Sequence, residues 1–163
     1  MENALGSFLM ENEMMEFGSD SEILEFAVAR EIEAYKFYMA LAERMERPKM
    51  QKVFEELANE EFGHKERLEL EIMKTGRVAA IEDISKIDTQ EYYIEGQYQF
   101  DMDYKSMLTM AIEKEKMAFR LYTDLAANVG DEQSRELLLT LAEEEVKHKL
   151  RFEYEYDALL KEE

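Results

Sequence analysis

The sequence has no cysteine, only one proline and only six glycines among its 163 residues. Without cysteine the chain cannot form a disulfide, present a thiolate nucleophile or hold a cysteine-ligated zinc or iron–sulfur site. Because helix breakers are scarce and residues of strong helix propensity dominate, the composition favours an all-α fold. The length suits one domain with a single sizeable core.

Basic residues and long apolar runs are also in short supply. The chain has 20 Lys and Arg against 39 Asp and Glu, which gives a formal charge of −19. Nucleic acid and anionic membrane surfaces are therefore not expected partners, because both are polyanions. No apolar run approaches the roughly 18 residues that span a bilayer. Residues 1–18 lack the basic start of a signal peptide, so we interpret them as an N-terminal tail and expect a cytoplasmic protein.

Apolar residues recur at steps of three and four in two stretches of the first half, which predicts two amphipathic helices. The first follows the capping sequence Ser19-Asp20-Ser21-Glu22 and is expected to run to about Arg47. The second begins at Pro48, which suits the first position of a helix, and ends near Gly76. The short link between them predicts antiparallel packing.

The second half repeats this pattern after a segment without a long period. Residues 77–103 are expected to form a crossover along the bundle, with one short helical turn. A third helix begins near Asp103 or Tyr104 and ends before Gly130, with Phe119 on its inward face, and a fourth runs from about Glu132 to Leu160. The prediction is one domain over residues 19–163, an antiparallel four-helix bundle.

The two halves are copies of one helical hairpin. Residues 27–69 align with 111–153 without a gap, and the identical residues concentrate on the inward stripe. The repeated halves span about 21–76 and 104–160, and such a doubling predicts a pseudo-two-fold axis through the bundle. The identities are Ala27, Glu31, Ala34, Tyr38, Leu41, Ala42, Leu57, Ala58, Glu60, Glu61, His64, Lys65, Arg67 and Glu69, each repeated 84 positions later.

Both copies place acidic residues and a histidine within the apolar stripes. Residues three apart share a helix face, so the Glu-x-x-His pairs at 61–64 and 145–148 each point to one place. Four buried carboxylates would be costly to desolvate, and two divalent cations would cancel their charge. Oxygen and nitrogen ligands without sulfur suit iron or manganese. The candidate ligands are Glu31, Glu61, His64, Glu115, Glu145 and His148.

Simpler interpretations exist for the same residues. The buried glutamates could be core groups that are hydrogen-bonded to tyrosine without any metal. Tyr38 and Tyr122 either hydrogen-bond a ligand carboxylate or only pack in the core. We expect Glu60 and Glu144 to lie on solvated faces, because neighbours on a helix point about 100° apart.

In combination, the two Glu-x6-Tyr and Glu-x-x-His motifs closely resemble the ferritin-like di-iron carboxylate proteins and, within them, the rubrerythrin family. The resemblance covers about residues 21–160. It implies that Glu61 and Glu145 bridge two irons. It also implies that Tyr38 and Tyr122 hydrogen-bond ligand carboxylates. Glu31 and His64 would complete the ligand set of one metal, and Glu115 and His148 that of the other.

The resemblance also implies an activity, with two departures. Many rubrerythrins carry an extra glutamate about one turn from the third-helix ligand, where this chain has Ile112 and Ala118 on either side of Glu115. They usually end in a rubredoxin-like domain, which needs cysteines. The implied function is a di-iron oxidoreductase that reduces hydrogen peroxide or dioxygen, with electrons from an external donor such as a rubredoxin-like protein.

Three alternatives stay open at this stage. The first is a dimanganese catalase-like enzyme. The second is iron oxidation for storage, or metal binding without turnover, although the internal repeat and the lack of a fifth helix disfavour a ferritin-type cage. A monomer or homodimer would favour the enzyme and a large cage would favour storage. The third, oxygenation of a macromolecule such as tRNA, would need a basic patch beside the site.

Overall fold

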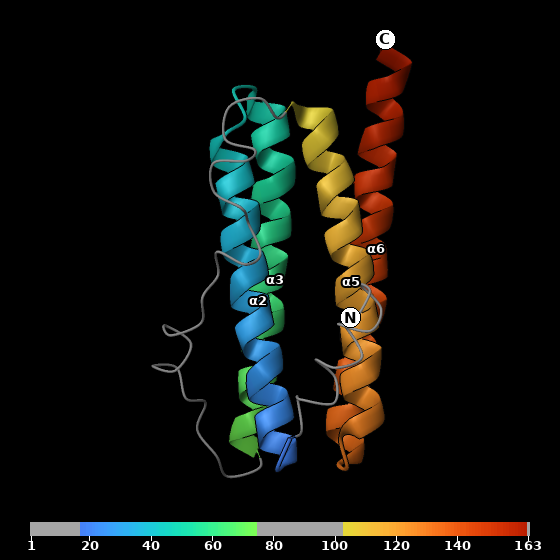
Figure 1. Ribbon diagram of the computed structural model, residues 1–163. Coiled ribbons are helices and arrows are strands. Elements are labelled where there is room, and N and C mark those ends of the chain that lie inside the picture. The colour runs from blue at the N-terminus through green and yellow to red at the C-terminus, as the bar shows by residue number, and fades with distance from the viewer. Residues whose placement is uncertain (1–16, 75–102, 163) are drawn as a thin grey trace, which may run out of the picture.

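The computed structural model describes residues 17–74 and 103–162, and within these residues the chain forms four long helices (Figure 1). They are α2 (Asp20–Glu43), α3 (Pro48–Lys74), α5 (Tyr104–Asn128) and α6 (Glu132–Glu162). The described residues contain no strand, so the predicted all-α class is confirmed. Helices of 24 to 31 residues are roughly 36 to 46 Å long at 1.5 Å per residue.

Local sequence signals set the helix starts. The Ser19 hydroxyl accepts a hydrogen bond from the Glu22 backbone at 3.3 Å, and Asp103 caps α5 by accepting from the Ser106 backbone at 2.8 Å. Both caps satisfy amide groups that have no partner inside the helix. Pro48 is the first residue of α3, as predicted.

The end of the first helix was predicted too late. The helix α2 ends at Glu43 rather than near Arg47. The Arg44 and Met45 amides bond carbonyls three residues back, each at 3.1 Å, which tightens the last turn into a 3₁₀ geometry. The ring of Pro48 also disfavours a helical conformation in the residue before it, so the chain has to leave the helix before that point.

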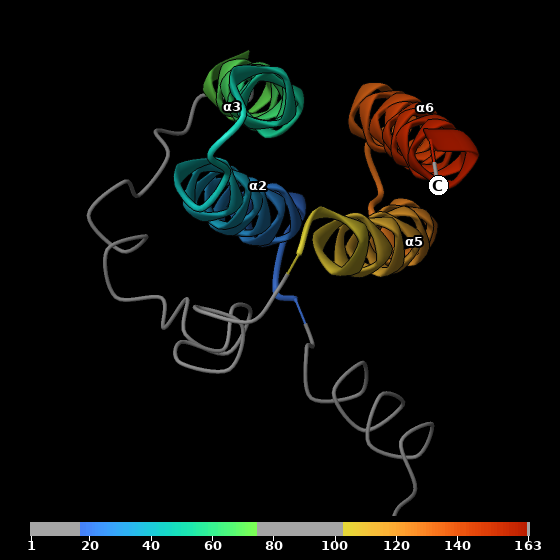
Figure 2. The same ribbon diagram turned by 90° about the horizontal axis from the view of Figure 1, so that it is seen from above.

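The four helices pack as two antiparallel hairpins side by side (Figure 2). Contacts are dense within the α2–α3 pair and within the α5–α6 pair, and sparse between the two pairs. The predicted crossover and its helical turn lie outside the described residues, as does most of the predicted tail. The end of α3 and the start of α5 lie at opposite ends of the bundle (Figure 1).

The apolar core consists of two clusters separated along the bundle axis. One is rich in aromatic rings, and Phe152 lies 5.5 Å from Tyr38 and 5.9 Å from Phe54 between ring centroids. The other is mostly aliphatic and includes Leu24, Leu68, Ile72, Leu125 and Leu138. The predicted acidic and histidine residues lie in the layer between these clusters, which therefore shield that layer from water on both sides.

Phe119 is not in the core, contrary to the prediction. Its side chain is 41% exposed and lines a groove between α5 and α6. Position 119 is turned about 40° from Glu115 around the helix. That rotation places the ring at the edge of the stripe facing α6 instead of at its centre.

Candidate metal centre

All six candidate ligands meet in one buried layer at the middle of the bundle. One glutamate comes from α2 and one from α5, while α3 and α6 each supply the Glu-x-x-His pair one helical turn apart. None of the six is more than 3% exposed, which is rare for charged side chains unless they are paired or bind a metal. They are Glu31, Glu61, His64, Glu115, Glu145 and His148.

His64 directs its Nδ1 atom at the carboxylates. This nitrogen lies 3.1 Å from Oε1 of Glu61, 3.4 Å from Oε2 of Glu31 and 3.8 Å from Oε2 of Glu145. His64 is therefore within reach of glutamates from α2, α3 and α6. Its ring lies parallel to that of His148, with centroids 5.4 Å apart.

His148 repeats this geometry in the other half. Its Nδ1 lies 3.0 Å from Oε1 of Glu145 and 3.6 Å from Oε1 of both Glu115 and Glu61. The two halves therefore present nearly the same arrangement, as the internal repeat requires.

The ligand atoms divide into two overlapping groups. One consists of Glu31, Glu61, His64 and Glu145, and within it the donor atoms lie within 4.8 Å of one another. The other consists of Glu61, Glu115, Glu145 and His148, with the same limit. Glu61 and Glu145 belong to both groups, so the arrangement provides two adjacent sites with two shared carboxylates.

Unpartnered polar atoms test whether these residues fit metal ions. Each of the six residues has a buried donor or acceptor atom without a hydrogen-bond partner: Nδ1 of both histidines and Oε1 of all four glutamates. Such atoms are rare in folded proteins because each one costs free energy. Metal ions would use these lone pairs and cancel the carboxylate charge. The donor set therefore fits two divalent cations.

The outer nitrogen of each histidine is held by a carboxylate from the opposite hairpin. Nε2 of His64 lies 2.8 Å from Oε1 of Glu144, and Nε2 of His148 lies 2.8 Å from Oε1 of Glu60. An ionised carboxylate only accepts, so each Nε2–H donates, and in the neutral imidazole the lone pair of Nδ1 faces the cluster. This tautomer is the one that a metal ligand needs.

Glu60 and Glu144 were predicted to lie on solvated faces. Glu60 is exposed and Glu144 is half-buried, but their contacts with the histidines were not predicted. Although partly exposed, both side chains reach across to the other hairpin and bind the histidines. A sequence signal existed, because the two glutamates occupy equivalent positions of the repeat. Because both glutamates lie beside the inward stripe and not within it, their position indicated a solvated face instead.

Two tyrosines also link the two hairpins, because each donates a hydrogen bond to a glutamate of the other hairpin. Tyr38 donates a hydrogen bond to Oε2 of Glu115, and Tyr122 donates one to Oε2 of Glu31. Both tyrosines are at most 2% exposed. Burial, with the charges of nearby glutamates, raises the pKa of each phenol well above its ordinary value, so both hydroxyls keep their protons and act as donors.

Crowding of the carboxylates raises the proton affinity of two of them, Glu61 and Glu145, in the absence of metal. Burial, with the charges of Glu31 and Glu115, raises the pKa of Glu61 to about 8. Burial and the charges of the other glutamates raise the pKa of Glu145 well above its ordinary value. The two carboxylates shared by both groups are therefore the ones that bind protons most readily when no cation is present.

The pKa values of the two histidines are also raised, but contacts with carboxylates are the cause and burial opposes them. Burial lowers the pKa of His64, but its contacts with Glu31 and Glu61 outweigh burial and raise that pKa to about 11. The pKa of His148 is raised to about 11 in the same way, with Glu115 among the causes. Protons and metal ions therefore compete for the same atoms of this cluster.

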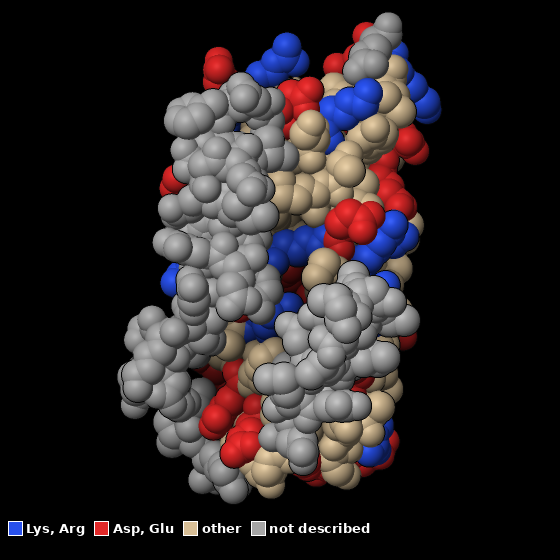
Figure 3. Space-filling view, viewed as in Figure 1, with Lys and Arg blue, Asp and Glu red and all other residues tan. Residues whose placement is uncertain are grey.

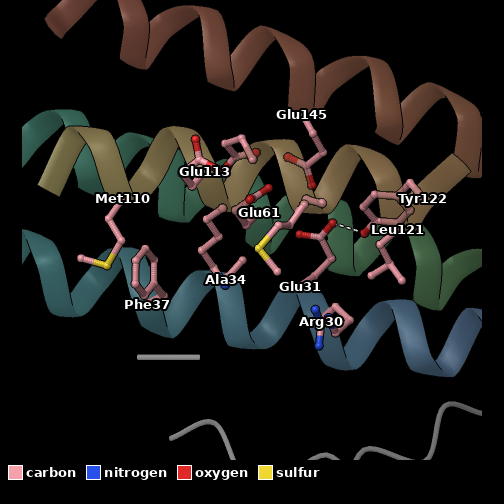
Figure 4. Close-up of a pocket in the computed structure, with 14 residues that line it drawn as sticks. Arg30, Glu31, Ala34, Phe37, Glu61, Met110, Glu113, Leu121, Tyr122 and Glu145 are labelled. Atoms are coloured by element: carbon pink, nitrogen blue, oxygen red, sulfur yellow. Dashed lines mark hydrogen bonds between the residues drawn. The ribbon is translucent and has the colours of Figure 1, made fainter. Parts of the chain in front are cut away.

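A cavity of about 280 Å³ connects the glutamates to the surface between α2 and α5 (Figure 4). All four candidate glutamates line it, and Figure 4 shows Glu31, Glu61 and Glu145 directed toward one another beside it. This cavity was not predicted from the sequence. The repeated alanines at 34 and 118, which also line it, were the available signal.

Two basic residues, one from each hairpin, line this cavity. Arg30 lies 4.0 Å from Glu33, and the Lys114 ammonium lies 4.8 Å from the centroid of the Phe37 ring. Burial and the Arg30 charge lower the pKa of Lys114. The face that carries the cavity is seen in Figure 3, where basic side chains gather at mid-height between the helices.

The fold and this layer of residues are those of the ferritin-like carboxylate proteins, whose bundles build a dinuclear site from two glutamates and two Glu-x-x-His pairs. The sequence matches the rubrerythrin family over residues 22–156, and the chain belongs to that family.

Comparison with solved structures supports the same fold. A hypothetical protein from Pyrococcus furiosus superposes with a TM-score of 0.62 at 23% identity, over 93% of this chain and 96% of that chain. No curated protein matches the sequence. In the described part of the chain, no helix has a stretch that is both long enough and apolar enough to cross a membrane.

Proposed function

We propose that this protein is a non-haem di-iron oxidoreductase that reduces hydrogen peroxide or dioxygen with electrons from an external donor. The observation that carries the proposal is the pair of overlapping four-residue groups, in which every member has an unpartnered buried atom. Family membership supports the same assignment. An external donor is required because the chain has no cysteine to hold a second iron centre.

Each candidate ligand has a defined place in this proposal. Glu31 and His64 would hold one iron, and Glu115 and His148 the other. Glu61 and Glu145, which belong to both groups, would bridge them. Bound iron supplies one-electron redox chemistry, and a ligand set of oxygen and nitrogen suits iron or manganese.

The surrounding residues orient the ligands and protect them from water. Tyr38 and Tyr122 fix the Oε2 atoms of Glu115 and Glu31 respectively, and the Oε1 atom of each glutamate is buried without a hydrogen-bond partner. The apolar clusters on either side exclude bulk water along the bundle axis. The cavity between α2 and α5 gives a small oxidant a route to the carboxylates.

The basic residues beside the cavity do not support a nucleic-acid substrate. Such a surface must neutralise several phosphates, on the order of six to ten contacts in a specific complex. Arg30 and Lys114 are the two basic residues among those that line this cavity, and Glu113 lines it as well. We therefore propose a small-molecule oxidant.

The experiment that tests the proposal begins with metal analysis of protein purified without added metal, followed by anaerobic loading with ferrous iron. We expect about two irons per chain and a near-ultraviolet ferric absorption that rises faster with hydrogen peroxide than with air. Glu61→Ala should abolish loading, whereas Glu66→Ala, which changes an exposed glutamate of the same helix, should leave it intact.

Other outcomes separate the alternatives. Two metals without a response to peroxide would favour iron storage or another oxidase. Manganese in place of iron would favour the catalase-like variant. A folded helical protein that binds no metal would show that the six residues form a hydrogen-bonded core, and the proposal would fail.

A further inference from the structure

The cavity between α2 and α5 is much larger than hydrogen peroxide needs. Its volume is about 280 Å³, whereas a protein cavity of roughly 150 Å³ is enough to hold benzene. Hydrogen peroxide has two heavy atoms. A molecule of roughly a dozen heavy atoms would fit the space by the same scale.

The internal repeat explains why the space exists. Ala34 lies one helical turn after Glu31, and Ala118 lies one turn after Glu115, so each alanine shares a helix face with a candidate ligand. Their small side chains leave the volume beside the glutamates unfilled. A larger residue at either position would occupy the approach to the candidate metal centre.

The lining has three kinds of surface. The inner end is formed by the four glutamates, whose charge two divalent cations would cancel. The walls are apolar and include Phe37, Met110, Met117 and Leu121. The remaining basic groups are Arg30 and Lys114, one from each hairpin, and both keep contacts of their own, with Glu33 and with the Phe37 ring.

Glu113 also lines the cavity, but its carboxylate has another partner. Its Oε2 atom lies 3.2 Å from the ammonium group of Lys116 on the same helix. An acidic group on a bound molecule would therefore be attracted to the Arg30 and Lys114 side of the cavity.

We propose that the substrate of this site is an organic hydroperoxide that carries an acidic group, and this inference rests on the proposed peroxide-reducing function. The apolar body contacts the walls of the cavity, the acidic group lies near Arg30 and Lys114, and the hydroperoxide faces the four glutamates. Ala34 and Ala118 determine the size of substrate that the site accepts.

The atoms and electrons of this reaction balance as follows. The O–O bond of the hydroperoxide breaks, and the substrate takes up two electrons and two protons. The products are the corresponding alcohol and one water molecule. The electrons come from a one-electron redox protein that acts as the external donor.

Binding is tested first, with probes that cannot react. Isothermal titration of the metal-loaded protein compares 4-isopropylbenzoate with isopropylbenzene, which lacks the carboxylate. We expect the carboxylate to bind and to lose affinity by roughly tenfold in Ala118→Leu and in Lys114→Gln. Lys114→Arg keeps the charge and should restore binding. Ala127→Leu, at an exposed alanine of the same helix, is the matched control and should have no effect.

Reactivity is tested with the matching hydroperoxides. Single-turnover oxidation of the ferrous-loaded protein is followed with cumene hydroperoxide, its para-carboxylate and hydrogen peroxide. We expect the carboxylated compound to react fastest of the two organic hydroperoxides. In Ala118→Leu, its rate relative to hydrogen peroxide should fall by roughly tenfold or more, with the metal content unchanged.

Two kinds of failure are distinguishable. A protein that takes up two irons and reacts with hydrogen peroxide, but binds neither aromatic probe and keeps its rate ratio in Ala118→Leu, would overturn the organic substrate alone. Equal binding of the charged and neutral probes would overturn the acidic group. A protein that takes up no metal, or reacts with no peroxide, would overturn the proposed function itself.

Discussion

The two helical hairpins carry the same buried residues but differ at their surfaces. In the first hairpin the rings of Tyr35 and Phe62 lie 5.5 Å apart, and the Lys65 ammonium lies 4.6 Å above Phe62. The equivalent positions of the second hairpin are Phe119 and Val146, and there a groove of about 430 Å³ opens between α5 and α6. One surface carries a pair of aromatic rings, and the other carries a groove.

A second difference lies next to the histidines. Arg67 binds Glu144 at 3.0 Å, so Glu144 has both an arginine and His64 as partners. The equivalent arginine, Arg151, binds Glu56 at 2.9 Å instead. The repeat is therefore nearly symmetric at the candidate ligands and asymmetric among the residues that surround the histidines. Substitutions in equivalent positions of the two hairpins show where the symmetry ends.

The largest effect is expected from the glutamates that both metal groups share. Glu61→Ala should reduce metal content from about two ions per chain to nearly none, because the carboxylate belongs to both groups. Glu31→Ala or Glu115→Ala should leave about one ion, because each belongs to one group. Elemental analysis with circular dichroism would show the difference, and equal loss in all three variants would contradict the bridging assignment.

Metal removal should make stability fall as pH rises. The folded-state pKa of Glu61 is about 8 against an ordinary value of 4.5, and that of His64 is about 11 against 6.5. Between pH 5 and 9 the folded state therefore binds more protons than the unfolded state, and the free energy of unfolding decreases. The lowered pKa of Glu115 acts in the opposite sense, but only below its ordinary value of 4.5.

Urea unfolding of metal-free protein at pH 5, 7 and 9 would measure this trend. We expect a loss of several kcal/mol across the range. Metal-loaded protein should not show the loss, because its ligands are already deprotonated. Metal-free protein that became more stable between pH 5 and 9 would contradict the assigned protonation of the cluster.

The tyrosines offer a test of symmetry between the halves. Tyr38→Phe and Tyr122→Phe should each weaken metal affinity by roughly tenfold and reduce stability by about 1 to 3 kcal/mol, because a buried carboxylate oxygen loses its donor. The two effects should agree, since the geometry is repeated. Competition with a chelator measures affinity, and Tyr154→Phe, at a residue 69% exposed, is the control. Clearly unequal effects would show that the two metal sites differ.

The sequence was sufficient for the fold and for predicting that six acidic and histidine residues meet in the bundle, because those features depend on local and periodic signals. Ser19 and Pro48 mark helix starts through their own chemistry. Glu31 and Glu115 stood out because an acidic residue interrupts an apolar stripe at the same position in both halves. Periodicity fixes the direction of such a residue within its helix.

The remaining features depend on distances between helices, which periodicity does not supply. Glu144 lies beside the inward stripe of α6, yet it binds His64 of α3 because the two helices are close at that level. The cavity beside Ala118 likewise depends on side chains of α2 and α5 that no single stripe relates. The groove that Phe119 lines also depends on two helices, since side chains of both α5 and α6 form it.

The smallest effect, and the most direct test of asymmetry, is expected from the glutamates behind the histidines. Glu144 is 29% exposed and is held by Arg67, whereas the Glu60 side chain is 55% exposed. Glu144→Gln should weaken metal affinity by roughly tenfold and Glu60→Gln by roughly threefold, because the more buried carboxylate polarises its histidine more strongly. Adding Arg67→Gln to Glu144→Gln should have little further effect, since the arginine acts through that carboxylate. Equal effects would mean that the symmetry extends beyond the ligands. A larger effect at Glu60 would mean that exposure does not determine how strongly each carboxylate supports its histidine.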